Sequence, residues 1–458
     1  MKVFISLCMG IMLLLSLQIF SGGCGQIMAP TGGPRDTIPP KLLIASPENR
    51  TTNFKGKKIV LEFDEYVQVD QLQQNLLVSP SPKMTPYVDY KFKTVTIKLR
   101  DTLEPNTTYV INLGNAIKDL NEGNVFKNFS YVFSTGTYID SLECKGRVLI
   151  AETGKVDSTL IVLLYKNGAD SAVEKQKPNY IAHLDGDGNF TIHNLAPGIY
   201  KVYALKDLTG SRTYSDRKSL FAFSDMPVIV TGDTKPVVLY AYAELKDNTA
   251  EKIITADKRL KYTIKIPAET QDILSPLVIK FNKAIKNFDL QKVILTDTLN
   301  QADASAQVGI DSTGKIITIQ KPWKENETYK LVISKSLSDT AGNTLSKPDT
   351  IRFKTKKEED YGSLTINFTN LSTIKNPVLQ FVLNNQVVRS FPLTSSRWSN
   401  KLFLPGEYEL RILSDENNNG TWDRGNFAKK IQPEKIIPVN KKVSVRGGGW
   451  ENEFDIPL

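Results

Sequence analysis

One segment near the end of the chain carries oxygen-bearing side chains at a spacing that suits a hard cation. Acidic, amide and hydroxyl side chains alternate from Asp415 to Asp423, and Gly420 lies where a sharp turn is needed. A calcium loop wraps its ion with carboxylate, amide and carbonyl oxygens in this order. The predicted ligands are Asp415, Asn417, Asn419, Thr421 through its carbonyl, and Asp423. With two carboxylates among them, we expect the weak affinity of an extracellular calcium site.

A polar turn is the alternative for this segment, because Asn and Gly are common turn residues. At position twelve of the loop, Asn426 stands where an EF-hand has a bidentate glutamate. The corresponding earlier segment, Asp207–Gly210, lacks the pattern. Structural calcium is therefore a candidate, and no cofactor is predicted to be required.

A second distinctive residue is Cys24. Lys2 precedes an apolar run that ends in Ser21-Gly22-Gly23, and this order is typical of a secretory signal peptide. A cysteine directly after small residues is where bacterial lipoproteins are lipidated. Polar interruptions of the run disfavour a spanning helix. We predict a lipoprotein signal peptide at residues 1–23 and lipidation of Cys24; an ordinary signal peptide with an incidental cysteine is the alternative.

Catalytic constellations are missing from the sequence. The two histidines, His183 and His193, flank the Asp185–Asn189 turn on strands that we expect to form a hairpin. A two-histidine metal site would need them on one face, and a register shift of one residue would separate them. Metalloprotease, serine-hydrolase and phosphate-loop motifs are absent. The sequence therefore predicts a protein that is not an enzyme, although a carboxylate pair for glycoside hydrolysis stays open.

Composition sets further bounds. The chain has 458 residues and a net charge of +9, with its basic residues scattered rather than gathered. Nucleic-acid binding would require a basic face, so none is predicted. After removal of Cys8 with the signal peptide, Cys144 is the only thiol besides Cys24. No intramolecular disulfide can form, and Cys144 is predicted to be a buried structural thiol.

Most of the chain shows the period-two alternation of half-buried strands, as at Ile59, Leu61 and Phe63. The segment Asp70–Leu77 is expected to form one or two helical turns. An internal repeat is also present, because Tyr109 to Tyr329 and Phe133 to Phe353 share one offset of 220 residues. A second repeat relates Asp207 to Asp415 at an offset of 208.

These repeats predict an all-β protein of tandem β-sandwiches in the order A-B-A′-B′. After a Gly/Pro-rich tether at 24–40, the predicted domains are A at 41–137, B at 138–246, A′ at 247–357 and B′ at 358–458.

The motifs of both domain types resemble known modules. Phe63-Asp64-Glu65 and the Asp-x-x-Gly-Asn type loop of the A domains are similar to bacterial Ig-like domains of S-layer proteins. Asp185–Phe190 followed by Leu195–Tyr200 in B is similar to carboxypeptidase regulatory-like (transthyretin-like) sandwiches. Together with Cys24, the arrangement resembles Ig-like-domain lipoproteins of the Bacteroidota.

This resemblance implies a non-enzymatic outer-membrane lipoprotein that acts as a scaffold or interaction subunit. Its implied partners are an outer-membrane β-barrel protein, as in the β-barrel assembly machinery or an uptake system, or other surface lipoproteins. A glycan- or host-binding adhesin is the alternative. The cell surface is favoured over the periplasmic face, although residues 25–29 lack the acidic export signal.

Overall fold

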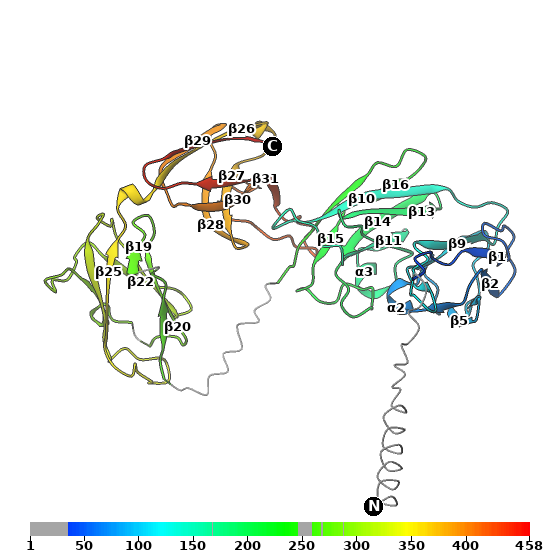
Figure 1. Ribbon diagram of the computed structural model, residues 1–458, viewed down its shortest axis with the longest axis horizontal. Helices are drawn as coiled ribbons and strands as arrows, with labels where there is room; N and C mark the ends of the chain where they lie inside the picture. The colour runs from blue at the N-terminus through cyan, green and yellow to red at the C-terminus, as the bar shows by residue number, and fades with distance from the viewer. Residues whose placement is uncertain (1–34, 167, 246–258, 267–268, 287) are drawn as a thin grey trace, which may run out of the picture. The chain divides into compact units, whose positions relative to one another are not determined.

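The computed structural model describes residues 35–166, 168–245, 259–266, 269–286 and 288–458. These residues divide into two compact units, one ending at Ile139 and one beginning at Asp140. Almost every regular element is a β-strand, as the sequence predicts (Figure 1).

The first unit holds domain A, which is built from two main sheets. The first sheet has the order β1-β2-β6-β5 and the second β4-β7-β9. A two-strand ladder of β3 and β8 completes the domain, and the single helical turn α2 lies within the segment predicted to be helical. The bounds are β1 Leu42–Ser46, β2 Lys58–Phe63, β3 Val67–Val69, α2 Leu72–Asn75, β4 Leu77–Ser79, β5 Tyr87–Lys91, β6 Thr94–Lys98, β7 Thr108–Gly114, β8 Ile117–Asp119 and β9 Phe129–Ser134.

Domain B packs a sheet of order β13-β10-β17 against a sheet of order β12-β11-β14-β15, with β16 also paired to β14. Its first and last strands, β10 and β17, pair in parallel. The bounds are β10 Leu142–Ile150, β11 Ile161–Lys166, α3 Ala172–Lys175, β12 Tyr180–His183, β13 Asn189–Leu195, β14 Gly198–Leu205, β15 Phe221–Phe223, β16 Val228–Val230 and β17 Val237–Ala241.

Domain A′ repeats the plan of domain A, with sheets of order β18-β20-β23-β22 and β19-β25-β24-β21. The bounds are β18 Tyr262–Ile264, β19 Thr270–Gln271, β20 Leu277–Phe281, η2 Leu290–Lys292, β21 Val293–Thr296, β22 Gln307–Ile310, β23 Ile316–Gln320, β24 Thr328–Ile333 and β25 Asp349–Thr355.

Domain B′ repeats the plan of domain B, with sheets of order β29-β26-β32 and β28-β27-β30-β31 and with β26 and β32 in parallel. The bounds are η3 Glu358–Asp360, β26 Gly362–Thr369, η4 Leu371–Thr373, β27 Pro377–Leu383, β28 Gln386–Pro392, β29 Arg397–Phe403, β30 Gly406–Ser414, β31 Lys435–Val445 and β32 Glu451–Pro457.

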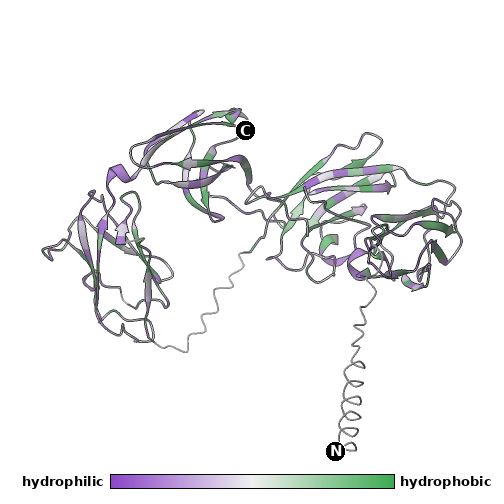
Figure 2. Cartoon of the chain, viewed as in Figure 1, coloured by the Kyte–Doolittle hydropathy of each residue, from purple (hydrophilic) through white to green (hydrophobic). Residues whose placement is uncertain are grey.

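Each domain has its own apolar core, formed by the side chains of alternate residues along its strands. In β2, for example, Ile59, Leu61 and Phe63 are fully buried while Lys58 and Glu62 are exposed. Figure 2 shows hydrophobic and hydrophilic residues interleaved along the sandwiches. Burial of one strand face per sheet is the main source of stability in such a domain.

The repeats of the B domains extend to single hydrogen bonds. The Tyr200 hydroxyl donates to the Ala196 carbonyl at 2.9 Å, and the Tyr408 hydroxyl donates to the Leu404 carbonyl at 3.0 Å. A buried tyrosine that closes its own upstream corner in this way is a recurring device of β-sandwiches. The internal repeat in the sequence is therefore a repeat of structure.

Candidate functional site

The predicted calcium loop begins directly after β30 and is folded around Asp415. The Asp415 side chain is fully buried, and its carboxylate accepts hydrogen bonds from the backbone N–H of Asn419 at 3.2 Å and of Gly420 at 2.6 Å. Gly420 has φ +77°, a left-handed conformation that glycine adopts at low cost. The turn predicted at this glycine is therefore present.

The amide side chains of the loop converge on Asp423. Asn417 Nδ2 and Asn419 Nδ2 each donate to Asp423 Oδ2 at 2.6 Å. The Asn417 Oδ1 accepts from the Asn419 N–H at 3.1 Å, and the Asn419 Oδ1 accepts from Thr421, so the amide nitrogens are the atoms that face Asp423. A cation beside Asp423 would require both amides to rotate and to give up these hydrogen bonds. Thr421 donates through its N–H and its hydroxyl to Asn419 Oδ1 at 2.7 and 2.8 Å. The side chains of four of the five predicted ligand residues are thus linked to one another in this loop, although Thr421 was predicted to bind through its carbonyl.

Glu434 is a further acidic residue of this loop that the sequence analysis missed. Its carboxylate is buried and accepts hydrogen bonds from the backbone N–H of Glu416 at 2.7 Å and of Asp423 at 2.9 Å. Burial raises the pKa of Glu434, and the nearby carboxylates of Asp415 and Asp423 also raise it, against the two backbone hydrogen bonds. The available signal was that Glu434 is the first acidic residue after Asp423.

Among the residues that the structure describes, no group of three or more His, Cys, Asp or Glu side chains is placed to hold a metal ion. A cation at this loop would therefore depend on amide oxygens as well as on Asp415 and Asp423. Such a donor set suits calcium, which accepts neutral oxygens readily. Calcium binding here stays a prediction.

The segment that follows the loop reaches from domain B′ onto domain B. The Phe427 side chain is buried, and its ring centroid lies 5.0 Å from that of Phe221 and 5.3 Å from that of Phe223. The rings of Tyr203 and Tyr214 lie 5.9 and 6.2 Å away. The backbone N–H of Phe427 also donates to Glu244 Oε1 at 2.6 Å. An aromatic side chain of B′ therefore completes an aromatic cluster of B.

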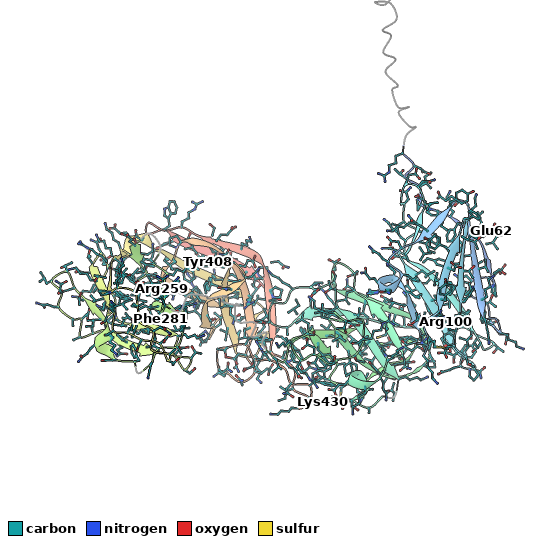
Figure 3. The ribbon with its side chains drawn as sticks, turned by 90° about the horizontal axis from the view of Figure 1, so that it is seen from below. Glu62, Arg100, Arg259, Phe281, Tyr408 and Lys430 are labelled. Carbon is teal, nitrogen blue, oxygen red and sulfur yellow. The ribbon has the colours of Figure 1, made fainter. Side chains whose placement is uncertain are left out.

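Polar contacts surround this aromatic cluster. Gln432 Nε2 donates to the Phe223 carbonyl at 2.9 Å and to Asp225 Oδ1 at 2.7 Å. Lys430 Nζ lies 3.2 Å from Asp170 Oδ2, and Figure 3 labels Lys430 beside the strands of domain B. Domains B and B′ thus share apolar and polar contacts although A′ separates them in the sequence.

The histidine prediction requires a correction. Strands β12 and β13 do not form a hairpin, because β12 pairs with β11 and β13 pairs with β10 in the opposite sheet. The Asp185 turn therefore carries the chain from one sheet to the other. His193 Nδ1 lies 3.2 Å from Glu143 Oε2, which is an exposed contact of its own strand pair.

The predicted burial of Cys144 is confirmed, whereas the predicted lipidation of Cys24 is not tested by the structure. Cys144 is fully buried, and burial raises the pKa of its thiol to about 11, so the thiol is inert at neutral pH. Cys24 and the predicted signal peptide lie outside the described residues. In the described part of the chain, no helix has the length and apolar character needed to cross a bilayer.

Comparison with protein families supports the reading of the A domains. A family model described as "Bacterial Ig-like domain" matches residues 36–135 and 262–355, which cover most of A and A′. Two stretches of the chain, one in A and one in A′, are therefore similar to bacterial Ig-like domains. Among curated proteins, no sequence matches the chain.

Several solved structures show local similarity. The Bacillus anthracis TIE protein is 11% identical, with 94% of this chain and 76% of that chain covered and a TM-score of 0.18. BcpA, the major pilin subunit of Bacillus cereus, is 11% identical, with 69% and 99% covered and a TM-score of 0.17. The N-terminal part of the bacterial S-layer protein SbsC is 16% identical, with 44% of each chain covered and a TM-score of 0.16. These TM-scores are too low for the chains to superpose as wholes.

Proposed function

We propose that this protein is a lipid-anchored, non-enzymatic scaffold on the outer membrane, held through Cys24 and facing the cell surface. Its partner would be an outer-membrane β-barrel protein or another surface lipoprotein. An accessory subunit of the β-barrel assembly machinery or of an uptake system is the specific form that we favour.

The observation that carries this proposal is the combination of separate β-sandwiches with a defined contact between B and B′. Each of the four cores is complete, so each domain offers edge strands and end loops as docking surfaces. The packing of the Phe427 side chain of B′ against Phe221 of B links two domains that are distant in sequence. A scaffold requires surfaces held in a defined order, and this contact supports that role for B and B′.

Affinity purification tests the partner directly. The chain would carry a tag after Leu458 and be recovered from outer membranes in mild detergent, with mass spectrometry as the readout. Stoichiometric recovery of a β-barrel protein is expected. Recovery of the tagged chain alone would contradict the scaffold role. Phe427→Ala is the matched variant, because loss of the partner in this variant would show that the B–B′ contact presents the surface.

The anchor is tested separately. We expect the wild-type chain to incorporate labelled palmitate and to fractionate with the outer membrane, whereas Cys24→Ser should lose the label and be released. Cys144→Ser is the control, because a buried thiol should not be acylated. Label retained in Cys24→Ser would contradict the proposed site.

A glycan- or host-binding adhesin is the second candidate. Trp450 favours it, because this side chain is 58% exposed and Arg446 lies 5.6 Å from its ring centroid. An exposed indole beside a cation suits stacking on an acidic sugar. Calcium-dependent binding to a glycan array that disappears in Trp450→Ala would support this function over the scaffold.

A further inference from the structure

Domain A carries three exposed apolar side chains at one end of its sandwich. Tyr66 is 48% exposed, Phe92 is 67% exposed and Leu120 is 52% exposed. The ring centroids of Tyr66 and Phe92 are 5.9 Å apart, and the backbone N–H of Leu120 donates to the Tyr66 carbonyl at 2.9 Å. We call these three residues the end patch. Single exposed apolar residues are ordinary, whereas a contiguous group of them marks an interaction site.

Domain A′ has the same backbone at this end but lacks the patch. The Leu120-to-Tyr66 hydrogen bond corresponds to the bond from the Thr340 N–H to the Ala284 carbonyl at 3.1 Å. The bond from the Val67 N–H to the Phe92 carbonyl at 2.9 Å corresponds to that from Ile285 to Gly314 at 2.8 Å. Tyr66, Phe92 and Leu120 thus occupy the positions of Ala284, Gly314 and Thr340.

The fold therefore does not require the apolar side chains of the end patch. Phe92 is notable because it has φ +55° at the tip of the β5–β6 hairpin, where Gly314 of A′ has φ +68°. A bulky residue rarely adopts this left-handed conformation, which costs glycine almost nothing. A strained and exposed aromatic residue at a hairpin tip points to a function outside the domain.

The end patch lies where the chain enters domain A. Arg35 Nη2 donates to the Glu122 carbonyl at 2.8 Å. Asn124 Nδ2 donates to the carbonyl of Asp36 at 3.1 Å and to that of Ile38 at 3.2 Å. These contacts hold the first described residues against the loop that begins at Leu120, and Ile38 is itself 58% exposed. Ten residues lie between Cys24 and Arg35, so these eleven Cα-to-Cα steps can span at most about 40 Å.

The charges around the end patch are mixed. Arg35, Lys41, Lys91 and Lys93 are the basic residues nearest to it in sequence or contact, and Asp36, Asp64, Glu65, Asp119 and Glu122 are the acidic ones. Lys91 Nζ lies 5.5 Å from the Phe92 ring centroid, and Lys93 Nζ lies 5.9 Å from that of Tyr66. Lysines that lie beside exposed aromatic rings suit the lipid–water interface, where aromatic side chains favour the headgroup level and lysines reach phosphates.

We propose that the end patch of domain A, formed by Tyr66, Phe92 and Leu120, inserts into the lipid–water interface of the membrane to which Cys24 is anchored. The inference rests on the proposed lipid anchor, which brings this end of the domain within reach of the bilayer. A lipid chain alone gives a marginal and reversible attachment, and a second contact with the membrane strengthens it. The patch would also orient domain A on its membrane.

A vesicle assay on the full mature chain tests this role without the lipid. Cys24→Ser protein would be floated with vesicles of phosphatidylethanolamine and phosphatidylglycerol. The matched variant carries Tyr66→Ala, Phe92→Gly and Leu120→Thr, which are the residues of A′ at the same backbone positions. We expect its vesicle partition to fall by about tenfold or more. Tyr87→Ala removes an exposed aromatic residue elsewhere on the domain and should leave the partition unchanged.

A reporter at the tip makes the result specific. Phe92→Trp should lose more fluorescence than the parent chain, which has four tryptophans of its own, when the vesicles contain lipids brominated in their acyl chains. Equal partition of the parent and the triple variant would overturn the proposal, and so would the absence of extra quenching in Phe92→Trp. Either result would overturn it even if the patch binds a soluble glycan or protein. Because the tested chain has no lipid, a failure of Cys24 lipidation in cells would not change this result.

Discussion

Domains A and A′ share one backbone plan, but each breaks the usual rule of burial in a different way: A exposes apolar side chains and A′ buries a charged one. In A the exception is at the surface, where Tyr66, Phe92 and Leu120 are exposed. In A′ it is inside, where Lys321 is buried in an ion pair with Asp303. The pair Ile59–Ile97 of β2 and β6 corresponds to the pair Leu277–Ile319 of β20 and β23. Two residues further along, Lys321 of A′ therefore occupies the position of the buried Leu99 of A. The comparison shows that one fold tolerates a polar interior or an apolar exterior, provided that the backbone hydrogen bonds are kept.

The largest expected effect comes from breaking the buried pair of A′. Asp303→Ala should destabilise A′ by about 3–5 kcal/mol, because it leaves the Lys321 ammonium buried without its counter-ion. Hydrogen exchange of β23 and β24 in the full chain would measure the loss. Asp70→Ala is the control in A, because the exposed ion pair of Asp70 and Lys118 is screened by solvent and should contribute little to stability. Equal effects of both variants would contradict the distinction.

The second test concerns a feature that the two domains share. Burial would raise the pKa of Asp119, but hydrogen bonds from the N–H groups of Glu122, Gly123 and Asn124 outweigh burial and hold this pKa below its usual value. The pKa of Asp339 is lowered by the equivalent balance. A carboxylate with a lowered folded-state pKa stabilises the fold above its unfolded pKa of about 3.9, and this stability is lost as the pH falls through the folded value.

We therefore expect both domains to lose stability together below about pH 4. Asp119→Ala and Asp339→Ala should each cost about 1–3 kcal/mol at neutral pH, because backbone N–H groups lose their buried acceptor. Hydrogen exchange of the loops at 119–124 and 339–343 would report the change. A loss confined to one domain would contradict the structural equivalence.

A third test applies the comparison to the B domains. Millimolar calcium should protect residues 415–434 of B′ from hydrogen exchange by about 1–3 kcal/mol, and leave the Asp207–Gly210 turn of B unaffected. Asp415→Asn should abolish the protection. No protection by calcium would show that the segment is a polar turn only, and equal protection by magnesium would show a cation site that does not select calcium.

The smallest expected effect is at the hairpin tip. Phe92→Gly should leave the stability of A unchanged or raise it by up to about 1 kcal/mol, because glycine relieves the left-handed strain. The reverse change, Gly314→Phe, should destabilise A′ by about 1–2 kcal/mol. Exchange rates in β6 and β23 would measure both. Marked destabilisation by Phe92→Gly would show that the aromatic ring serves the fold.

The strands and the repeat could be predicted from the sequence because burial imposes a period of two on the side chains. The same period does not say which strand is the neighbour. For this reason the hairpin expected around Asp185 was wrong, since the turn that a hairpin uses also suits a crossing between sheets. The short helix at Leu72–Asn75 and the buried Cys144 needed only local information and were predicted.

The candidate site was predicted only in part, for a physical reason. Asp415, Asn417, Asn419 and Asp423 are close in sequence, so their spacing was informative. Glu434 joins them only because the loop folds back on itself, and Phe427 acquires its role from rings in another domain. The end patch of A was visible only once equivalent hydrogen bonds had matched Phe92 to Gly314. Contacts between distant segments carry no local pattern.

The parallel pairing of first and last strands has a mechanical consequence for the B domains. In B the ladder runs from Gly146–Val237 to Ile150–Ala241, and in B′ from Ser363–Glu451 to Thr369–Pro457. A force that draws the two ends of either domain apart pulls these neighbouring strands in opposite directions along their length. The evenly spaced bonds of a parallel ladder then share the load in shear instead of opening one at a time. Each B domain is therefore built to resist unfolding when its two ends are pulled apart.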